Sequence, residues 1–204
     1  MNQKERREQR QKMILEAAMH DFVKVGYEKV SMESLSRHPG ISKGTLYHYF
    51  QSKDEIFLAC ARETFDQLKM YLEANQGKLT IDQGKESIAA YFMLRESFFN
   101  EHPVLMGIFE IAMVRPPKHL TTAISEIREP LQKMNQAFLN AVISHMKLRN
   151  HLEPARALAY LEIMEKCFWD LLPKQDMDLH EMFQKVGELL DMLLFGIVVQ
   201  EPTE

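Results

Sequence analysis

The sequence has little cysteine, no long apolar run and no leader-like segment. Only Cys60 and Cys167 occur, with no CxxC pair, so a disulfide scaffold is excluded and a reducing compartment is expected. No run reaches the roughly 18 apolar residues of a membrane span, and the richest, residues 189–199, contains Asp191 and Gly196. The N-terminus is polar and basic, unlike a signal peptide. We therefore expect a cytoplasmic protein with no membrane partner.

The chain also lacks an excess of positive charge, since its formal net charge is −4. It has no general attraction for nucleic acid, so any nucleic-acid surface must be local. Residues 1–55 carry ten Lys and Arg against eight Asp and Glu, whereas residues 151–204 carry four against eleven. The basic N-terminal part either faces a polyanion or is a solvated helix start.

Strand-like alternation is scarce, and apolar residues at spacings of three and four predict helices almost throughout. We predict an all-α fold of about nine helices with a substantial core, since 46% of the residues are hydrophobic. The first helix is expected over residues 5–25, with Ile14, Ala18 and Phe22 on its buried face and Gly26 ending it. Later helices are expected from the Ser52 capping box to about residue 75, then over residues 82–100, 103–115, 120–147 with a kink or a broken start at Pro130, 154–172 and 178–199.

Two short helices lie between the first helix and the Ser52 capping box. Ser31 and Ser42 are each placed to cap one of them, and residues 38–41 form a Gly-containing turn, which is the helix-turn-helix arrangement. Leu35, Ile41, Leu46 and Phe50 are predicted core residues. The second short helix keeps a polar, donor-rich face that suits entry into a major groove. That face carries Lys43, Gly44, Thr45, Tyr47 and His48.

These motifs resemble the TetR family of bacterial transcriptional regulators. The resemblance is carried by residues 14–18 with Phe22, and by residues 26–27, 31–32, 41–50 and 52–55. It covers roughly residues 10–58. It implies an N-terminal three-helix DNA-binding domain over residues 1–52 and a C-terminal helical effector-binding and dimerisation domain over residues 53–204.

The resemblance also implies roles by position. Lys43, Gly44 and Thr45 correspond to base or close backbone contacts, and Lys53 to a phosphate clamp. The basic segment around Arg6, Arg7 and Arg10 is expected to reach the adjacent minor groove. Most family members have Ala where this chain has Ser36, and Ala-Gly where it has Pro39-Gly40. The full expected DNA-binding set is Ser31, Met32, Ser42, Lys43, Gly44, Thr45, Tyr47, His48 and Lys53.

The last two predicted helices are apolar over wider arcs than one packed face requires. The excess indicates a second copy of the chain as partner, and the resemblance implies the same four-helix homodimer interface. The alternative is a fully buried helix pair in a monomer. The expected dimer-interface residues are Leu161, Phe168, Phe183, Val186, Leu190, Leu193 and Ile197.

Aromatic and Met side chains accumulate between residues 92 and 169. Met adapts to irregular space and to ligands, and helical bundles form pockets between facing helices. Such residues are also ordinary core residues, so both interpretations stay open. The expected lining of a pocket for a small, lipophilic effector is Phe92, Phe99, Met106, Phe109, Met113, Phe138 and Trp169.

The sequence offers no catalytic constellation. No His has a Glu three positions before it, and HExxH, P-loop and GxSxG motifs are absent. We expect no enzyme activity, no cofactor and no metal. The leading hypothesis is a repressor that binds a near-palindromic double-stranded operator as a dimer and is released by its effector. The alternatives are an activator, a protein-binding co-regulator of the same fold and, more remotely, a small helical enzyme.

Overall fold

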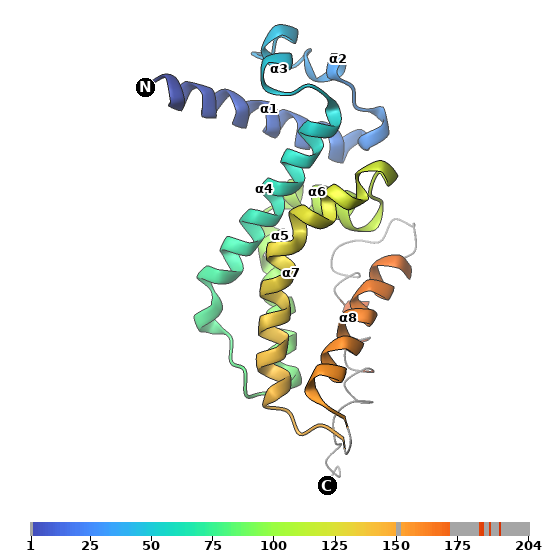
Figure 1. Ribbon diagram of the computed structural model, residues 1–204. Coiled ribbons are helices and arrows are strands. Elements are labelled where there is room, and N and C mark those ends of the chain that lie inside the picture. The colour runs from blue at the N-terminus through green and yellow to red at the C-terminus, as the bar shows by residue number, and fades with distance from the viewer. Residues whose placement is uncertain (1, 150–151, 172–183, 186–187, 189–191, 193–204) are drawn as a thin grey trace. The chain divides into compact units, whose positions relative to one another are not determined.

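The computed structural model describes residues 2–149, 152–171, 184–185, 188 and 192. Within them the regular elements are eight α-helices and three short 3₁₀-helices (Figure 1), which confirms the all-α prediction. The chain divides into two compact units. The first unit comprises Met1–Gln67 and His102–Glu129, and the second unit comprises Leu68–Glu101 and Pro130–Glu204. The helix predicted over residues 178–199 lies outside the described residues.

Helix α1 (Gln3–Val25) opens the first unit. Asn2 and Glu5 form a capping box, since the Glu5 N–H donates to Asn2 Oδ1 and the Asn2 N–H to Glu5 Oε2, each at 2.8 Å. This cap starts the helix two residues before the predicted start. Ile14, Ala18, Met19 and Phe22 form its buried face, and Gly26 ends it with φ +82°.

Helices α2 (Met32–Leu35) and α3 (Lys43–Tyr49) form the predicted helix-turn-helix. The four predicted core residues, Leu35, Ile41, Leu46 and Phe50, are all buried. Gly40, with φ +80°, makes the turn between the helices. Ser36 is accommodated because its hydroxyl donates to the Glu33 carbonyl at 2.8 Å, a bond that satisfies a half-buried Ser inside a short helical segment.

Helix α4 (Lys53–Ala74) starts at Ser52, whose hydroxyl accepts from the Glu55 N–H at 3.2 Å. The Glu55 carboxylate accepts from the Gln51 N–H at 2.6 Å. In the predicted capping box it would accept from the Ser52 N–H, so this bond reaches one residue further back. Helix α6 (Pro103–Val114) packs against α1, and a 3₁₀ turn, η3 (Lys118–Leu120), follows it. A short 3₁₀ turn, η1 (Tyr27–Lys29), joins α1 to α2.

The second unit contains α5 (Lys85–Glu101), most of α7 (Thr121–Ser144) and α8 (Pro154–Leu171), and the 3₁₀ turn η2 (Gln76–Lys78) precedes α5. Helix α7 runs through Pro130 as one element, so the helix has no broken start there. Tyr91 and Phe138 stack with ring centroids 4.5 Å apart, and the buried Tyr91 hydroxyl donates to Asn135. This hydrogen bond satisfies the buried Tyr91 hydroxyl and the side-chain oxygen of Asn135.

Candidate nucleic-acid interface

Helix α3 presents one polar face to solvent while its other face is anchored in the core. Leu46 is fully buried, and Lys43, Gly44, Tyr47 and His48 are exposed. Tyr47 is 42% exposed, which is high for an aromatic residue that merely caps a core. A short helix held by one buried Leu and flanking core residues can offer its first turns to a DNA groove without losing its fold.

The N-terminus of α3 is fixed by hydroxyl groups. The Ser42 hydroxyl accepts from the Thr45 N–H at 3.0 Å and lies 2.8 Å from the Thr45 hydroxyl. Gly44 has no atom within 4 Å of where a Cβ would stand. The fold therefore does not require Gly at this position, whereas a close approach to a DNA backbone would.

The turn of the helix-turn-helix is held from α1. His38 Nε2 lies 2.9 Å from Asp21 Oδ2, and a Cβ on Gly40 would be 3.4 Å from Met13 Sδ. Ser31 caps α2 by accepting from the Ser34 N–H at 3.0 Å, and the adjacent Met32 is half-buried. The His38–Asp21 pair was not predicted, because nothing local in the sequence links two residues 17 positions apart.

Lys53 is engaged within the protein. Its ammonium donates to the carbonyls of Tyr27 at 3.1 Å and Glu28 at 3.4 Å, and lies 4.2 Å from the centroid of the Tyr27 ring. The ammonium thus satisfies two carbonyls of η1 and makes a cation–π contact. The phosphate contact expected of Lys53 stays a prediction. That contact would use the same ammonium group that this structure holds against η1.

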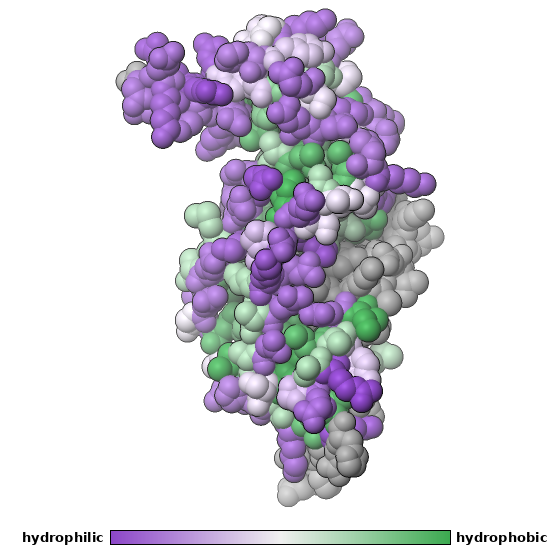
Figure 2. Space-filling view, in the orientation of Figure 1, coloured by the Kyte–Doolittle hydropathy of each residue, from purple (hydrophilic) through white to green (hydrophobic). Residues whose placement is uncertain are grey.

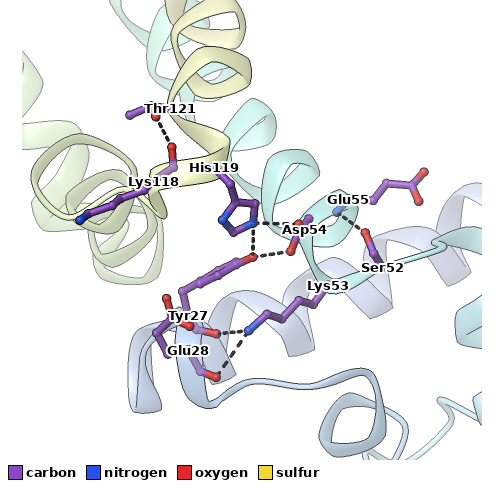
Figure 3. Close-up of polar contacts among 9 residues, drawn as sticks. All are labelled: Tyr27, Glu28, Ser52, Lys53, Asp54, Glu55, Lys118, His119 and Thr121. Carbon is purple, nitrogen blue, oxygen red and sulfur yellow. Dashed lines mark hydrogen bonds and ion pairs between the residues drawn. The ribbon is translucent and has the colours of Figure 1, made fainter.

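A hydrogen-bonded network adjoins Lys53 (Figure 3). The Tyr27 hydroxyl donates to Asp54 Oδ1, and His119 Nε2 lies 2.9 Å from Asp54 Oδ2 and 3.3 Å from the Tyr27 hydroxyl. The hydrogen bond from Tyr27 is the main cause that lowers the pKa of Asp54, with His119 adding to it against a smaller effect of burial. Burial, followed by the Asp54 contact, raises the pKa of Tyr27. Nothing in the sequence indicated this network, because its members lie up to 92 residues apart.

The basic residues at the start of α1 lie in a helix. Arg6, Arg7 and Arg10 belong to α1, as the predicted helix over residues 5–25 implies, and the minor-groove contact expected of them stays a prediction. All three are exposed, and within the described chain none forms an ion pair. Arg6, Arg10 and Met13 share one face, the face that meets the turn at Gly40. The N-terminal end of α1 is hydrophilic in Figure 2, which suits contacts with phosphates.

The predicted effector-pocket residues are divided between the two units. Phe99 is buried and Phe92 and Phe138 are half-buried in the second unit, whereas Met106 and Phe109 are buried and Met113 is half-buried in the first. The side chain of Trp169 lies outside the described residues. The pocket therefore stays a prediction.

A groove of about 680 Å³ lies within the first unit, between α1, α4 and the start of α6. Its lining includes the apolar residues Leu15, Met19 and Leu105 and the acidic residues Glu16 and Glu63. None of the predicted effector residues lines it. Sequence periodicity did not indicate it, because it forms between helices that are distant in the chain.

The predicted dimer residues are only partly described. Leu161 is buried in the second unit against Ile143 and Ala157. The side chain of Phe168 lies outside the described residues, as do Phe183, Val186, Leu190, Leu193 and Ile197. The dimer interface stays a prediction.

The part of the chain that the structure describes shows neither a metal site nor a reactive cysteine. Those residues include no group of three His, Cys, Asp or Glu side chains that could hold a metal ion. Cys60 is buried, and burial raises the pKa of its thiol, which is typical of an unreactive core cysteine. Among the same residues no helix has the length and apolarity to cross a membrane.

Comparison with known proteins finds relatives among bacterial transcriptional regulators. Residues 14–60 match the family model described as bacterial regulatory proteins, tetR family. The chain is 26% identical over 139 residues to the uncharacterised HTH-type transcriptional regulator YhgD of Bacillus subtilis, covering 68% of each chain. It is 36% identical over 59 residues to the HTH-type transcriptional repressor Rv1474c of Mycobacterium tuberculosis, which covers 29% of this chain and about a third, 32%, of that repressor.

A solved structure shares the fold over nearly the whole chain. The fatty acid degradation regulator FadR from Bacillus halodurans superposes with a TM-score of 0.67 at 14% identity, covering 89% of this chain and 94% of that one. These relatives are transcriptional regulators, in agreement with the prediction that the chain is not an enzyme. The chain therefore resembles the tetR family of bacterial regulatory proteins over residues 14–60 and shares the fold of a solved regulator over most of its length.

Proposed function

We propose that this protein is a ligand-responsive repressor that binds a near-palindromic operator as a homodimer. The observation that carries the proposal is α3, whose exposed face holds Lys43, Gly44, Tyr47 and His48 while Leu46 anchors it. A protein of this fold that no longer bound DNA would have no need of these exposed hydrogen-bond donors on α3. Repression is favoured by the relative from Mycobacterium tuberculosis, which is named a repressor.

The expected DNA contacts divide into two classes. Lys43, Gly44 and Thr45, at the start of α3, are proposed to reach base edges or the adjacent backbone. Tyr47 and His48, with Ser31, Met32 and Ser42, are proposed to position the helix on phosphates. One short helix reads few base pairs, so a dimer is required to read two half-sites about 34–36 Å apart. The last two helices, residues 154–172 and 178–199, are the proposed dimer surface.

The effector is proposed to be a small lipophilic molecule bound by residues 53–204. The abundance of aromatic and Met side chains supports this, as does the likeness in fold to a protein named a fatty acid degradation regulator. Binding releases DNA only if the effector prefers a conformation with a different separation of the two α3 helices. The shift equals the difference in effector affinity between the two conformations.

The test is fluorescence anisotropy with labelled DNA from upstream of the gene, at two salt concentrations. Wild-type protein is compared with a Lys43→Gln, Tyr47→Ala double variant and with Lys24→Gln, which replaces an exposed cation in the last turn of α1. We expect specific, salt-sensitive binding by the wild type and Lys24→Gln, and at least tenfold weaker binding by the double variant. Unfolding curves verify that all three are folded. Absence of any binding at low salt would favour the co-regulator, and an increase in transcription on binding would indicate an activator.

A further inference from the structure

The network around Asp54 joins three segments of the first unit (Figure 3). Tyr27 lies in η1 directly after α1, Asp54 in the first turn of α4, and His119 in η3, between α6 and α7. Tyr27 and Asp54 both belong to the part of the chain that carries the helix-turn-helix. His119 approaches from 65 residues further along. The segment after α6 therefore reaches the DNA-binding part through this side chain.

His119 fixes the orientation of the Asp54 carboxylate. One carboxylate oxygen meets His119 Nε2 at 2.9 Å and the other accepts from the Tyr27 hydroxyl. With both oxygens occupied, the carboxylate plane is determined by two partners on different elements. His119 is 59% exposed along its side chain, so its removal leaves no cavity in the core, and its effect must act through the hydrogen bonds that it makes.

The network continues from Asp54 to Lys53. The Tyr27 hydroxyl is held by Asp54, while the Tyr27 ring and carbonyl hold the Lys53 ammonium at 4.2 Å and 3.1 Å. The Tyr27 ring is packed edge-on against Phe57, with centroids 5.2 Å apart, and has little room to move alone. A displacement of His119 is thus transmitted through Asp54 and Tyr27 to Lys53.

The turn that carries His119 is itself well defined. The Leu120 N–H donates to the Pro117 carbonyl at 2.8 Å, and the Thr121 hydroxyl donates to the Lys118 carbonyl. These bonds join η3 directly to the start of α7. A rearrangement at the start of α7 therefore moves His119 together with this turn.

We propose that His119 is a positioning residue for DNA binding. Through Asp54 and Tyr27 it sets the place of Lys53 and of the first turn of α4, and so couples the α6–α7 connection to the DNA-facing surface. The inference rests on the proposed function for its DNA-binding consequence. The mechanical coupling itself does not depend on DNA.

The first experiment measures the salt dependence of DNA binding for three variants. His119→Ala removes the contact, and His119→Gln retains an N–H donor that reaches about as far as imidazole Nε2. His20→Ala is the matched control, since His20 is an exposed histidine of the same unit. Each lost phosphate contact lowers the salt slope by about 0.9, so the loss of one contact in each subunit of the proposed dimer lowers the ratio of affinities at about 50 and 200 mM salt by about 12-fold. We expect this fall for His119→Ala alone.

Simple loss of folded protein would weaken binding equally at both salt concentrations and leave the ratio unchanged. An unchanged ratio for His119→Ala therefore overturns the inference, whatever its affinity. A His119→Gln variant as impaired as His119→Ala also overturns it, because the hydrogen bond would then not be the active feature.

The second experiment needs no DNA. Amide hydrogen exchange is followed at Glu55 and Ile56, whose N–H groups donate to the Ser52 side chain and carbonyl at the start of α4. We expect several-fold faster exchange there in His119→Ala and wild-type rates in His20→Ala. If the wild type binds no DNA but this coupling is found, the proposed function fails while the coupling stands. Unchanged exchange in His119→Ala refutes the coupling even if DNA binding is confirmed.

Discussion

The crossing of α1 and α6 depends on Gly107. A Cβ at this position would lie 2.5 Å and 2.7 Å from the two methyl carbons of Val23 and 3.2 Å from its Cβ. Carbon atoms in good contact are about 3.5–4.0 Å apart, so Gly107→Ala creates overlaps of about 1 Å. The substitution therefore tests how closely these helices must approach.

Rotation of Val23 cannot relieve the overlap. Both of its methyl groups are already too close, and a helical Val has one strongly preferred rotamer. The helices must separate instead, and overpacking of this kind costs about 1–3 kcal/mol. Ala favours a helix interior over Gly by up to about 1 kcal/mol, so we expect a net loss of about 0.5–2 kcal/mol in the free energy of unfolding.

Urea unfolding of a double-mutant cycle measures this. Val23→Ala removes both methyl groups, and Val23 is 41% exposed, so that substitution alone costs little. We expect Gly107→Ala to be nearly neutral in the Val23→Ala background, with a coupling of about 1 kcal/mol or more. A Gly107→Ala variant as stable as the wild type, or one equally destabilised in both backgrounds, would refute the steric argument.

Three further predictions follow from the first unit. Gly44→Ala should stabilise the free protein by up to about 1 kcal/mol, because its Cβ meets nothing, yet weaken DNA binding at least tenfold. Urea unfolding and anisotropy measure the two effects, and unchanged affinity would contradict close approach of α3. The lowered pKa of Asp54 means that its carboxylate stabilises the fold above the ordinary Asp pKa of about 3.9 and loses this effect as the pH falls through the folded-state pKa. The difference in unfolding free energy between wild type and Asp54→Asn, measured in urea, should therefore be largest near about pH 6 and should disappear below about pH 4. A difference that does not change with pH would show that the ionised carboxylate is not its cause. An Arg6→Gln, Arg10→Gln variant removes four arginines from the proposed dimer and should lower the salt slope of DNA binding by about 3.6 with unchanged helicity by circular dichroism. An unchanged slope would remove α1 from the interface.

The local elements could be predicted because their causes lie within a few residues. Ser31 and Ser42 can each reach the backbone N–H three residues later, and Gly26 and Gly40 tolerate the positive φ that their turns require. The buried residues of the helix-turn-helix followed from helical periodicity in the same way. Helix α1 starts two residues before its predicted start because Asn2 and Glu5 form a capping box, whose three-residue spacing is present in the sequence.

Contacts between distant segments were beyond such reasoning. The sequence indicated Lys53 as a phosphate ligand, but not that its ammonium would lie against Tyr27. Nor did it indicate that His119 would meet Asp54 or that Gly107 would face Val23. Each of these depends on how α6 and the turn after it pack on α1 and α4, and many packings bury the same apolar face.

The sequence by itself determined the helical class, the helix-turn-helix and the polar face of α3, because capping and periodicity act over one or two turns of chain. The tertiary structure alone decided which charged groups of that region are already engaged, and which residue after α6 reaches it. Hydrogen bonds between segments 65 residues apart form only once packing has brought the segments together. Sequence patterns with a spacing of three or four residues indicate which residues share a helix face, but not which distant segments will meet.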